Sequence, residues 1–195
     1  MLSSNFGEII TMFVAVLFQL PTPLKASHIL WVNLITDSLP ALALGIDKND
    51  KNVLMRKKPR NPKEGLFAYG GWSFTVFYGV LIAAITLYAF YLGGQTYAFT
   101  VLGVSQLFHA IGMRDKDKSV FQMKHLENPF MMGAFFLGLG LQAMVTEIPY
   151  FVQLFGTVRL SLQEWCLLLG ISAIPLVAHE LLLIPGKLLG MGKKQ

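Results

Sequence analysis

The stretch WVNLITDSLPALALG, residues 31–45, carries polar side chains within sequence that is apolar enough to enter a membrane. Asn33, Thr36 and Asp37 lie close together, and Pro40 follows them. Their spacing places the three polar side chains on one face of a helix. A carboxylate near the centre of a membrane-spanning helix costs about 3 kcal/mol on insertion scales. The stretch is therefore interpreted as a membrane helix whose polar face has a specific task.

The composition indicates an integral membrane protein. Of the 195 residues, 54% are hydrophobic and only 14% are charged. A soluble domain of this length could not hide so much apolar surface from water. The single cysteine, Cys166, excludes an internal disulfide framework and a cysteine-rich metal site, so we interpret it as a packing residue.

Six stretches are long and apolar enough to cross a bilayer, which takes about 20 residues. They cover about 1–20, 28–46, 67–92, 96–113, 129–148 and 162–185. The first ends at the turn PTP (21–23), and Gly93-Gly94 separates the third from the fourth. We therefore predict an all-α, polytopic bundle of six transmembrane helices. Small residues in the third and fifth stretches favour close helix packing.

The basic residues predict how this bundle is oriented. With six spans, the loops of about 47–66 and 114–128 and the C-terminal tail share one side of the membrane. Fourteen of the sixteen Lys and Arg residues lie on that side, and only Lys25 and Arg159 do not. Basic clusters between apolar spans mark cytoplasmic loops more often than a nucleic-acid surface. We expect these loops to be cytoplasmic and expect no nucleic-acid partner.

Polar residues within the predicted spans form three clusters. Asn5 and Glu8 are three residues apart in the first span, and Gln106 precedes His109 by three in the fourth. The candidate ligands supply oxygen atoms, which suit Ca²⁺ or Mn²⁺ better than softer metals. They are Asn5, Glu8, Asn33, Thr36, Asp37 and Gln106. A divalent cation would balance the charge of the two carboxylates and offset the free-energy cost of burying them in the membrane.

Pro40 strengthens this interpretation. It removes a backbone donor and disturbs the helix one turn earlier, so carbonyl oxygens near Thr36 can turn toward an ion. Other roles remain open: the Asn side chains could be interhelical hydrogen-bonding groups, and His109 could be a structural partner of Asp37. For Glu147 and Glu180 we favour interfacial or loop-pairing roles.

The segments SSNFGE, LPTPL, LWVNLITDSLPALALG and MRKKPRNPKEGLF together resemble the fifth and sixth membrane helices of P-type calcium pumps. The similarity continues through LFHAIGMRDKDKSVF and covers essentially the whole chain. These pumps are the sarcoplasmic-reticulum and secretory-pathway types and their bacterial relatives. The resemblance implies that the six spans are the last six of ten helices, in a bacterial plasma membrane.

The resemblance also implies roles for individual residues. Asn5 and Glu8 match fifth-helix ion ligands, and Asn33, Thr36 and Asp37 match sixth-helix ligands. Gln106 stands where the family usually has an acid, so one negative charge is lost at the eighth helix. Ser38 replaces a frequent glycine, which would stiffen local unwinding.

The chain carries no DKTGT phosphorylation motif, no nucleotide-binding domain and no PEGL run of a fourth helix. MLSSNFGE lacks the basic region of a signal peptide, so we expect the chain to begin inside a membrane segment. We expect no ATP hydrolysis by this chain alone, since Mg-ATP would act only in a full-length pump. The expected partners are membrane lipid, the missing N-terminal helices and the cytoplasmic A, N and P domains. The alternatives are a passive divalent-cation carrier and a non-transporting regulatory protein or fragment.

Overall fold

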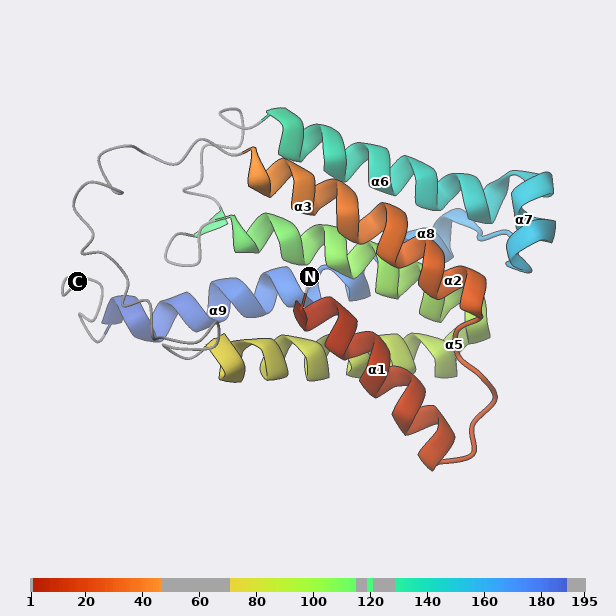
Figure 1. Cartoon of the computed structure of the whole chain (residues 1–195), viewed down its shortest axis with the longest axis horizontal. Helices are drawn as coiled ribbons and strands as arrows, with labels where there is room; N and C mark the ends of the chain where they lie inside the picture. The colour runs from red at the N-terminus through yellow and green to blue at the C-terminus, as the bar shows by residue number, and fades with distance from the viewer. Residues whose placement is uncertain (1, 47–70, 115–118, 121–128, 189–195) are drawn as a thin grey trace.

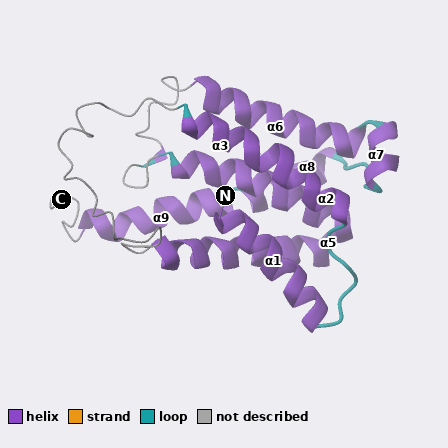
Figure 2. Ribbon diagram, viewed as in Figure 1, coloured by secondary structure: helices purple, strands orange, loops and turns teal. Residues whose placement is uncertain are grey.

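The computed structural model describes residues 2–46, 71–114, 119–120 and 129–188. Within these ranges the chain is all-helical with short connections and has no strand (Figure 2). The elements are α1 (Leu2–Leu17), α2 (Ala26–Trp31), η1 (Val32–Asp37), α3 (Ser38–Gly45), α5 (Gly71–Met113), α6 (Pro129–Glu147), α7 (Pro149–Phe155), α8 (Leu162–Ser172) and α9 (Ile174–Leu188). The all-α prediction is thus confirmed for the described residues. The predicted loop of 47–66 and most of that of 114–128 lie outside them.

The elements α2, η1 and α3 form one continuous rod with a wider turn in its middle. That turn, η1, is a six-residue π-helix, and both of its flanking residues keep right-handed helical backbone angles. Asn33, Thr36 and Asp37 all belong to it. Pro40 lies just after the π-helix and cannot donate a backbone hydrogen bond to the preceding turn. The predicted disturbance of the helix near Thr36 is therefore confirmed, and it takes the form of a π-helical turn.

The long element α5 is two helices joined at a tight reversal. Gly93 and Gly94 have non-helical backbone angles, and Gly94 has a φ of +73°, a conformation that L side chains rarely adopt. Figure 1 shows the yellow first half and the green second half running back alongside each other. The predicted boundary at Gly93-Gly94 is confirmed.

Three helical segments of the described residues are long and apolar enough to cross a membrane: Gly71–Met113, Pro129–Glu147 and Leu162–Leu183. The element α1 is also apolar but shorter. Large apolar side chains point outward along the bundle, and Phe13, Val16 and Tyr91 are among the most exposed. An outer surface of this kind suits a hydrocarbon solvent rather than water.

The bundle packs around the second half of α5, which holds most of the buried residues of that element. One core cluster joins Leu24 and Val32 to Phe99, Leu102 and Val145. Figure 1 shows α1 crossing α5 obliquely and α3 running beside α6. This packing brings α1, η1 and the second half of α5 to one interior point.

Candidate cation site

Glu8 is held in the interior by a close contact between α1 and α5. A methyl group on Gly7 would lie 3.0 Å from the Ile82 side chain and 3.1 Å from the Gly79 carbonyl oxygen. A methyl group on Gly79 would lie 2.6 Å from Phe6. The two glycines therefore let the helix backbones approach. The neighbouring Glu8 is consequently only 6% exposed.

Two amide side chains donate hydrogen bonds to the Glu8 carboxylate. Asn33 Nδ2 lies 2.9 Å from Glu8 Oε2, and Gln106 Nε2 lies 3.2 Å from Glu8 Oε1. Both amides are neutral, so the negative charge is solvated by dipoles without being cancelled. The interaction joins three elements that are far apart in sequence, namely α1, η1 and α5.

The Gln106 amide leaves its oxygen available. Gln106 is 3% exposed, and its Oε1 is buried without a hydrogen-bond partner within the described structure. Burying a carbonyl oxygen without a hydrogen-bond partner costs about 1–3 kcal/mol of folding free energy, so such oxygens usually have a partner such as a water molecule or an ion. A cation beside Glu8 would supply the missing partner, since hard cations bind carbonyl and carboxylate oxygens.

Asp37 and Gln106 line one small cavity of about 40 Å³, together with Ser4, Pro40 and His109. Asp37 is 6% exposed. The space exceeds the roughly 10–15 Å³ that a cavity needs to hold one water molecule. A single ion or water molecule fits between the α1, η1 and α5 side chains.

The π-helical turn changes the backbone available to this cavity. The Ser38 hydroxyl donates to the Asn33 carbonyl oxygen at 2.9 Å, and the Thr36 hydroxyl donates to the Val32 carbonyl oxygen at 2.9 Å. Because Pro40 has no N–H, the Thr36 carbonyl oxygen lacks the donor that a regular helix would provide. Pro40 thus removes the regular helical partner of a backbone oxygen next to Asp37.

The six predicted ligands do not all converge. Glu8, Asn33 and Gln106 are joined by hydrogen bonds, and Asp37 shares a cavity with Gln106. Asn5 is exposed instead of facing the cavity. Thr36 is fully buried, but its hydroxyl is bonded within its own helix. Among the described residues, no three His, Cys, Asp or Glu side chains group together.

The sequence interpretation missed one residue of the cavity and left another undecided. Ser4 lines the cavity next to the predicted pair on α1, and a serine in an apolar helix gives no strong signal of its own. His109 also lines it, and its ring stands 4.5 Å from that of Tyr78. His109 Nδ1 is buried without a partner in the described residues. This aromatic packing favours the structural role considered for His109.

Glu147, at the end of α6, and Glu180, within α9, have the loop-pairing roles that were predicted. Glu147 Oε1 accepts from Trp165 Nε1 at 2.8 Å and from the Leu160 backbone N–H. Glu180 accepts from the Ser119 hydroxyl and from the Val120 backbone N–H. Neither glutamate lines the cavity at Asp37. Glu8 does not line it directly but is hydrogen-bonded to Gln106, which does.

The fold and the buried cluster define an integral membrane protein with a carboxylate–amide pocket between its helices. Residues 21–184 match the family described as "Cation transporting ATPase, C-terminus", and the chain belongs to this family. The match places the chain among the membrane regions of cation-transporting ATPases.

Three relatives illustrate the similarity. The chain is 40% identical over 212 residues to "Calcium-transporting ATPase 1" of Bacillus cereus, covering 96% of this chain and 24% of the relative. It is 41% identical over 195 residues to "Calcium-transporting ATPase" of Bacillus subtilis, covering 93% and 22%. It is 28% identical over 190 residues to the mouse "Calcium-transporting ATPase type 2C member 1", covering 93% and 21%. The chain thus spans about a quarter of the length of the curated relatives it matches.

Proposed function

We propose that the chain is the membrane domain that carries part of the cation site of an ATP-driven Ca²⁺ pump. The observation that carries this proposal is the buried Glu8 carboxylate, bonded by Asn33 and Gln106 beside a cavity that Asp37 lines. Two carboxylates and several neutral oxygens match the charge and ligand preference of Ca²⁺. The names of the relatives support calcium and do not mention Mn²⁺.

In this proposal Glu8, Asp37, Asn33 and Gln106 hold the ion from three elements. Gln106 turns its unpaired Oε1 toward the ion, and Asp37 supplies the second negative charge. Asn5 and Thr36 remain candidate ligands, although Asn5 lies on a face that is exposed in this structure and the Thr36 hydroxyl is bonded within its own helix. Helices from the missing part of the pump would cover that face, and this accounts for an exposed polar residue one turn before Glu8.

We further propose six membrane spans with the basic segments in the cytoplasm of a bacterial cell. The supporting elements are α1, the α2–η1–α3 rod, the two halves of α5, α6 and the α8–α9 pair. The cytoplasmic A, N and P domains would lie in the remaining three quarters of a full-length pump and bind Mg-ATP there. Phosphorylation would tilt the helices and alternate access to the site.

The test is ATP-dependent ⁴⁵Ca²⁺ uptake into inverted membrane vesicles that contain the full-length product of the gene encoding this chain. Asp37→Asn should abolish uptake, because the amide lacks the negative charge, while Glu147→Gln makes the same chemical change far from the cavity and should retain it. Uptake that does not require ATP would favour the passive carrier instead. Equal uptake by wild type and Asp37→Asn would contradict the proposed site.

A further inference from the structure

A second polar cluster lies at the other end of the α2–η1–α3 rod, where α2 meets α7. The segment after α7 is tied to its neighbours, because Thr157 Oγ1 donates to the Val145 carbonyl oxygen at 2.7 Å and the Val158 N–H donates to Thr96 Oγ1 at 3.0 Å. These bonds anchor the C-terminal end of α7 to α6 and α5. The end of α7 is thus a fixed point against which α2 packs.

His28 docks α2 onto that fixed point through Nε2, while its Nδ1 accepts a hydrogen bond at the start of its own helix. His28 Nε2 lies 2.9 Å from the Phe155 carbonyl oxygen, and the Lys25 backbone N–H points to His28 Nδ1 at 3.3 Å. A carbonyl oxygen only accepts and an N–H only donates. The ring must therefore be neutral, with its proton on Nε2. His28 is fully buried and stacks on Phe99 with the ring centroids 4.3 Å apart.

Lys25 reinforces the same contact. Its ammonium lies 3.4 Å from the Phe155 carbonyl oxygen and 3.3 Å from that of Gly156. A cation at the C-terminal end of a helix is favoured by the unpaired carbonyls there. Gly156 has a φ of +63°, and a methyl group on it would collide with the Lys25 ammonium. The left-handed φ favours glycine at this position, and a larger residue would also require the Lys25 side chain to move.

This contact lies one helical turn from the proposed ion ligands. Asn33 Nδ2, which donates to Glu8, also donates to the Ile29 carbonyl oxygen at 3.1 Å. Ile29 follows His28 directly in α2. A shift of α2 along α7 would therefore carry Asn33 with it and change its distance to Glu8.

We propose that His28 is a positioning residue for the cation site: its neutral Nε2–H form docks α2 on the carbonyl end of α7, and its protonation undocks the rod. This inference rests on the proposed function, since it assumes that Asn33 and Glu8 bind the ion. The contact between His28 and Phe155 is separate from the ion ligands and lies at the opposite end of η1 from Pro40.

The sign of the pH dependence follows from the contacts. Protonation at Nδ1 removes the acceptor for the Lys25 N–H and adds a positive charge beside the Lys25 ammonium, which shares the Phe155 carbonyl with the ring. The other groups packed on the ring, from α5 and α7, are the phenyl side chain of Phe99 and the Phe155 backbone. The Phe155 carbonyl oxygen and the face of the Phe99 ring interact favourably with a cation. Neither contact offsets the free energy of burying a charged imidazolium beside the Lys25 ammonium. A histidine in water protonates near about pH 6.5, so acidification below that value favours the undocked rod.

The test uses the complete chain in lipid nanodiscs with three readouts. The ¹⁵N spectrum of the imidazoles should contain an Nε2–H tautomer signal that His28→Gln removes. Trp31 stands edge-on to Phe155 at 5.1 Å, so its fluorescence should change with pH as α2 leaves α7, and His28→Gln should abolish that change. Calcium binding is the third readout, compared between variants at about pH 7.5 and about pH 5.5.

At the higher pH, His28→Gln should bind calcium like wild type, because glutamine can donate and accept at the same positions without titrating. His28→Leu should bind about tenfold more weakly, the effect expected for the loss of a hydrogen bond. At the lower pH, wild type should lose several-fold more affinity than His28→Gln. Protonation of Glu8 and Asp37 weakens both proteins equally and cancels in this comparison. His179→Gln, a buried histidine on α9 beside Gly112, should keep the wild-type profile.

Two results would overturn the inference. One is a pH profile of calcium binding that is identical in wild type and His28→Gln. The other is Trp31 fluorescence that titrates equally in both proteins. The proposed function is judged separately by Glu8→Gln: if that change leaves calcium binding intact, the ligand assignment fails, while the tautomer and fluorescence readouts still decide whether His28 docks the rod.

Discussion

At the scale of single residues, the Glu8 carboxylate organises the interior. It lies inside an apolar bundle and accepts one hydrogen bond on each oxygen, from Asn33 and from Gln106. Each such bond to a charged group contributes about 1.5–3 kcal/mol. The amides alone do not remove the charge, and Asp37 adds another nearby. A bound cation explains why two acids are retained here.

The residue identities of this cluster could be predicted, whereas its pairing could not. Helical spacing placed Asn33, Thr36 and Asp37 on one face, and oxygen chemistry indicated a hard cation. The hydrogen bond from Gln106 to Glu8 depends on how α5 packs against α1. The spacing of residues within one helix carries no information about that packing. The same limit explains why Asn5 was grouped with Glu8 although it faces outward here.

Gln106→Glu tests the missing third charge. The new carboxylate would stand beside Glu8 in place of an amide donor, so the ion-free protein should become less stable through like-charge repulsion. Calcium should relieve that repulsion and bind about tenfold more tightly. The measurement is the thermal unfolding midpoint with and without calcium. Gln106→Leu is the control and should weaken calcium binding; a midpoint in Gln106→Glu that calcium does not raise more than in wild type would contradict the account.

At the scale of secondary structure, the decisive feature is the π-helical turn of η1. A π-turn holds one extra residue per turn and recurs at functional sites. The sequence predicted a disturbance near Thr36 from Pro40, but the π-helical form depends on how the rod is held at both ends. The breaks that glycine marks, as at Gly93-Gly94, were predictable. The interruption between α8 and α9, after Ser172, also has a signal in the sequence, because Pro175 at the second position of α9 cannot donate a hydrogen bond to the preceding turn.

Pro40→Ala should convert part of η1 to regular α-helix. The restored N–H could bond the Thr36 carbonyl oxygen, and a proline inside a helix is unfavourable by about 3 kcal/mol. The thermal midpoint should therefore rise while calcium affinity falls about tenfold, because backbone oxygen is withdrawn from the cavity. Circular dichroism melts and calcium titration measure the two effects. Leu42→Ala changes an exposed position on the same rod, and it should alter the thermal midpoint and the calcium affinity less than Pro40→Ala does. A Pro40→Ala protein with unchanged affinity would show that the freed carbonyl is not used.

Gly7→Val tests whether the α1–α5 contact positions Glu8. The valine side chain would meet Ile82 and the Gly79 carbonyl oxygen, so α1 should move away from α5. Overpacking of this kind costs about 1–3 kcal/mol. The thermal midpoint and calcium affinity should both fall. Gly133→Val is the matched control, because nothing lies within 4 Å of a side chain at Gly133. If Gly7→Val and Gly133→Val lower the thermal midpoint and the calcium affinity equally, the close approach of α1 and α5 does not position Glu8.

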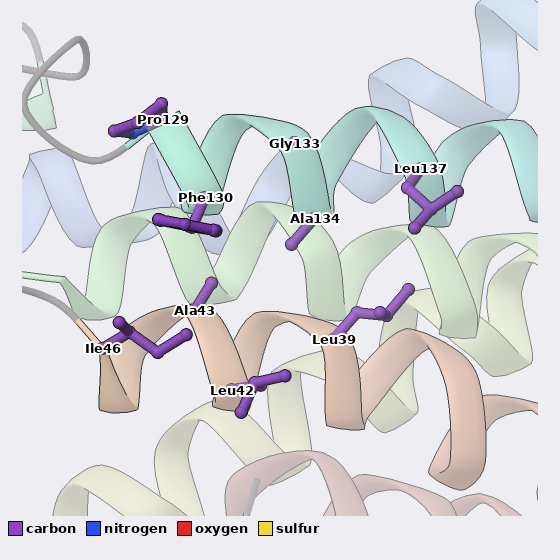
Figure 3. A pocket seen from close by; sticks show the side chains of 9 residues that line it. All are labelled: Leu39, Leu42, Ala43, Ile46, Pro129, Phe130, Gly133, Ala134 and Leu137. Atoms are coloured by element: carbon purple, nitrogen blue, oxygen red, sulfur yellow. The ribbon is translucent and has the colours of Figure 1, made fainter.

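At the scale of the whole molecule, the bundle has two different ends. The polar contacts of Lys25, His28 and Tyr97 gather at one end, with Tyr97 Oη bonded to Glu164. At the other end an apolar groove of about 460 Å³ opens between α3 and α6, lined by Leu42, Phe130 and their neighbours (Figure 3). The basic segments adjoin this second end in sequence. The asymmetry fits a membrane protein with one cytoplasmic face.

Cysteine labelling tests that orientation. In a Cys166→Ser background, Lys51→Cys and Arg159→Cys lie in segments predicted to be on opposite sides of the membrane. A membrane-impermeant maleimide should label the cysteine at 159 in intact cells and the cysteine at 51 only in inverted vesicles. Labelling of both from the same side would contradict the six-span topology. Detergent-solubilised protein, in which both cysteines should react, controls for local reactivity.

The most direct test of the central claim is equilibrium ⁴⁵Ca²⁺ binding to the purified chain in lipid nanodiscs. The account predicts saturable binding to wild type, loss of that binding in both Glu8→Gln and Asp37→Asn, and wild-type binding in Glu147→Gln. The amide variants keep the size of the side chains and remove only the charge. Binding that survives in Glu8→Gln and Asp37→Asn alike would contradict a calcium site built on these two carboxylates.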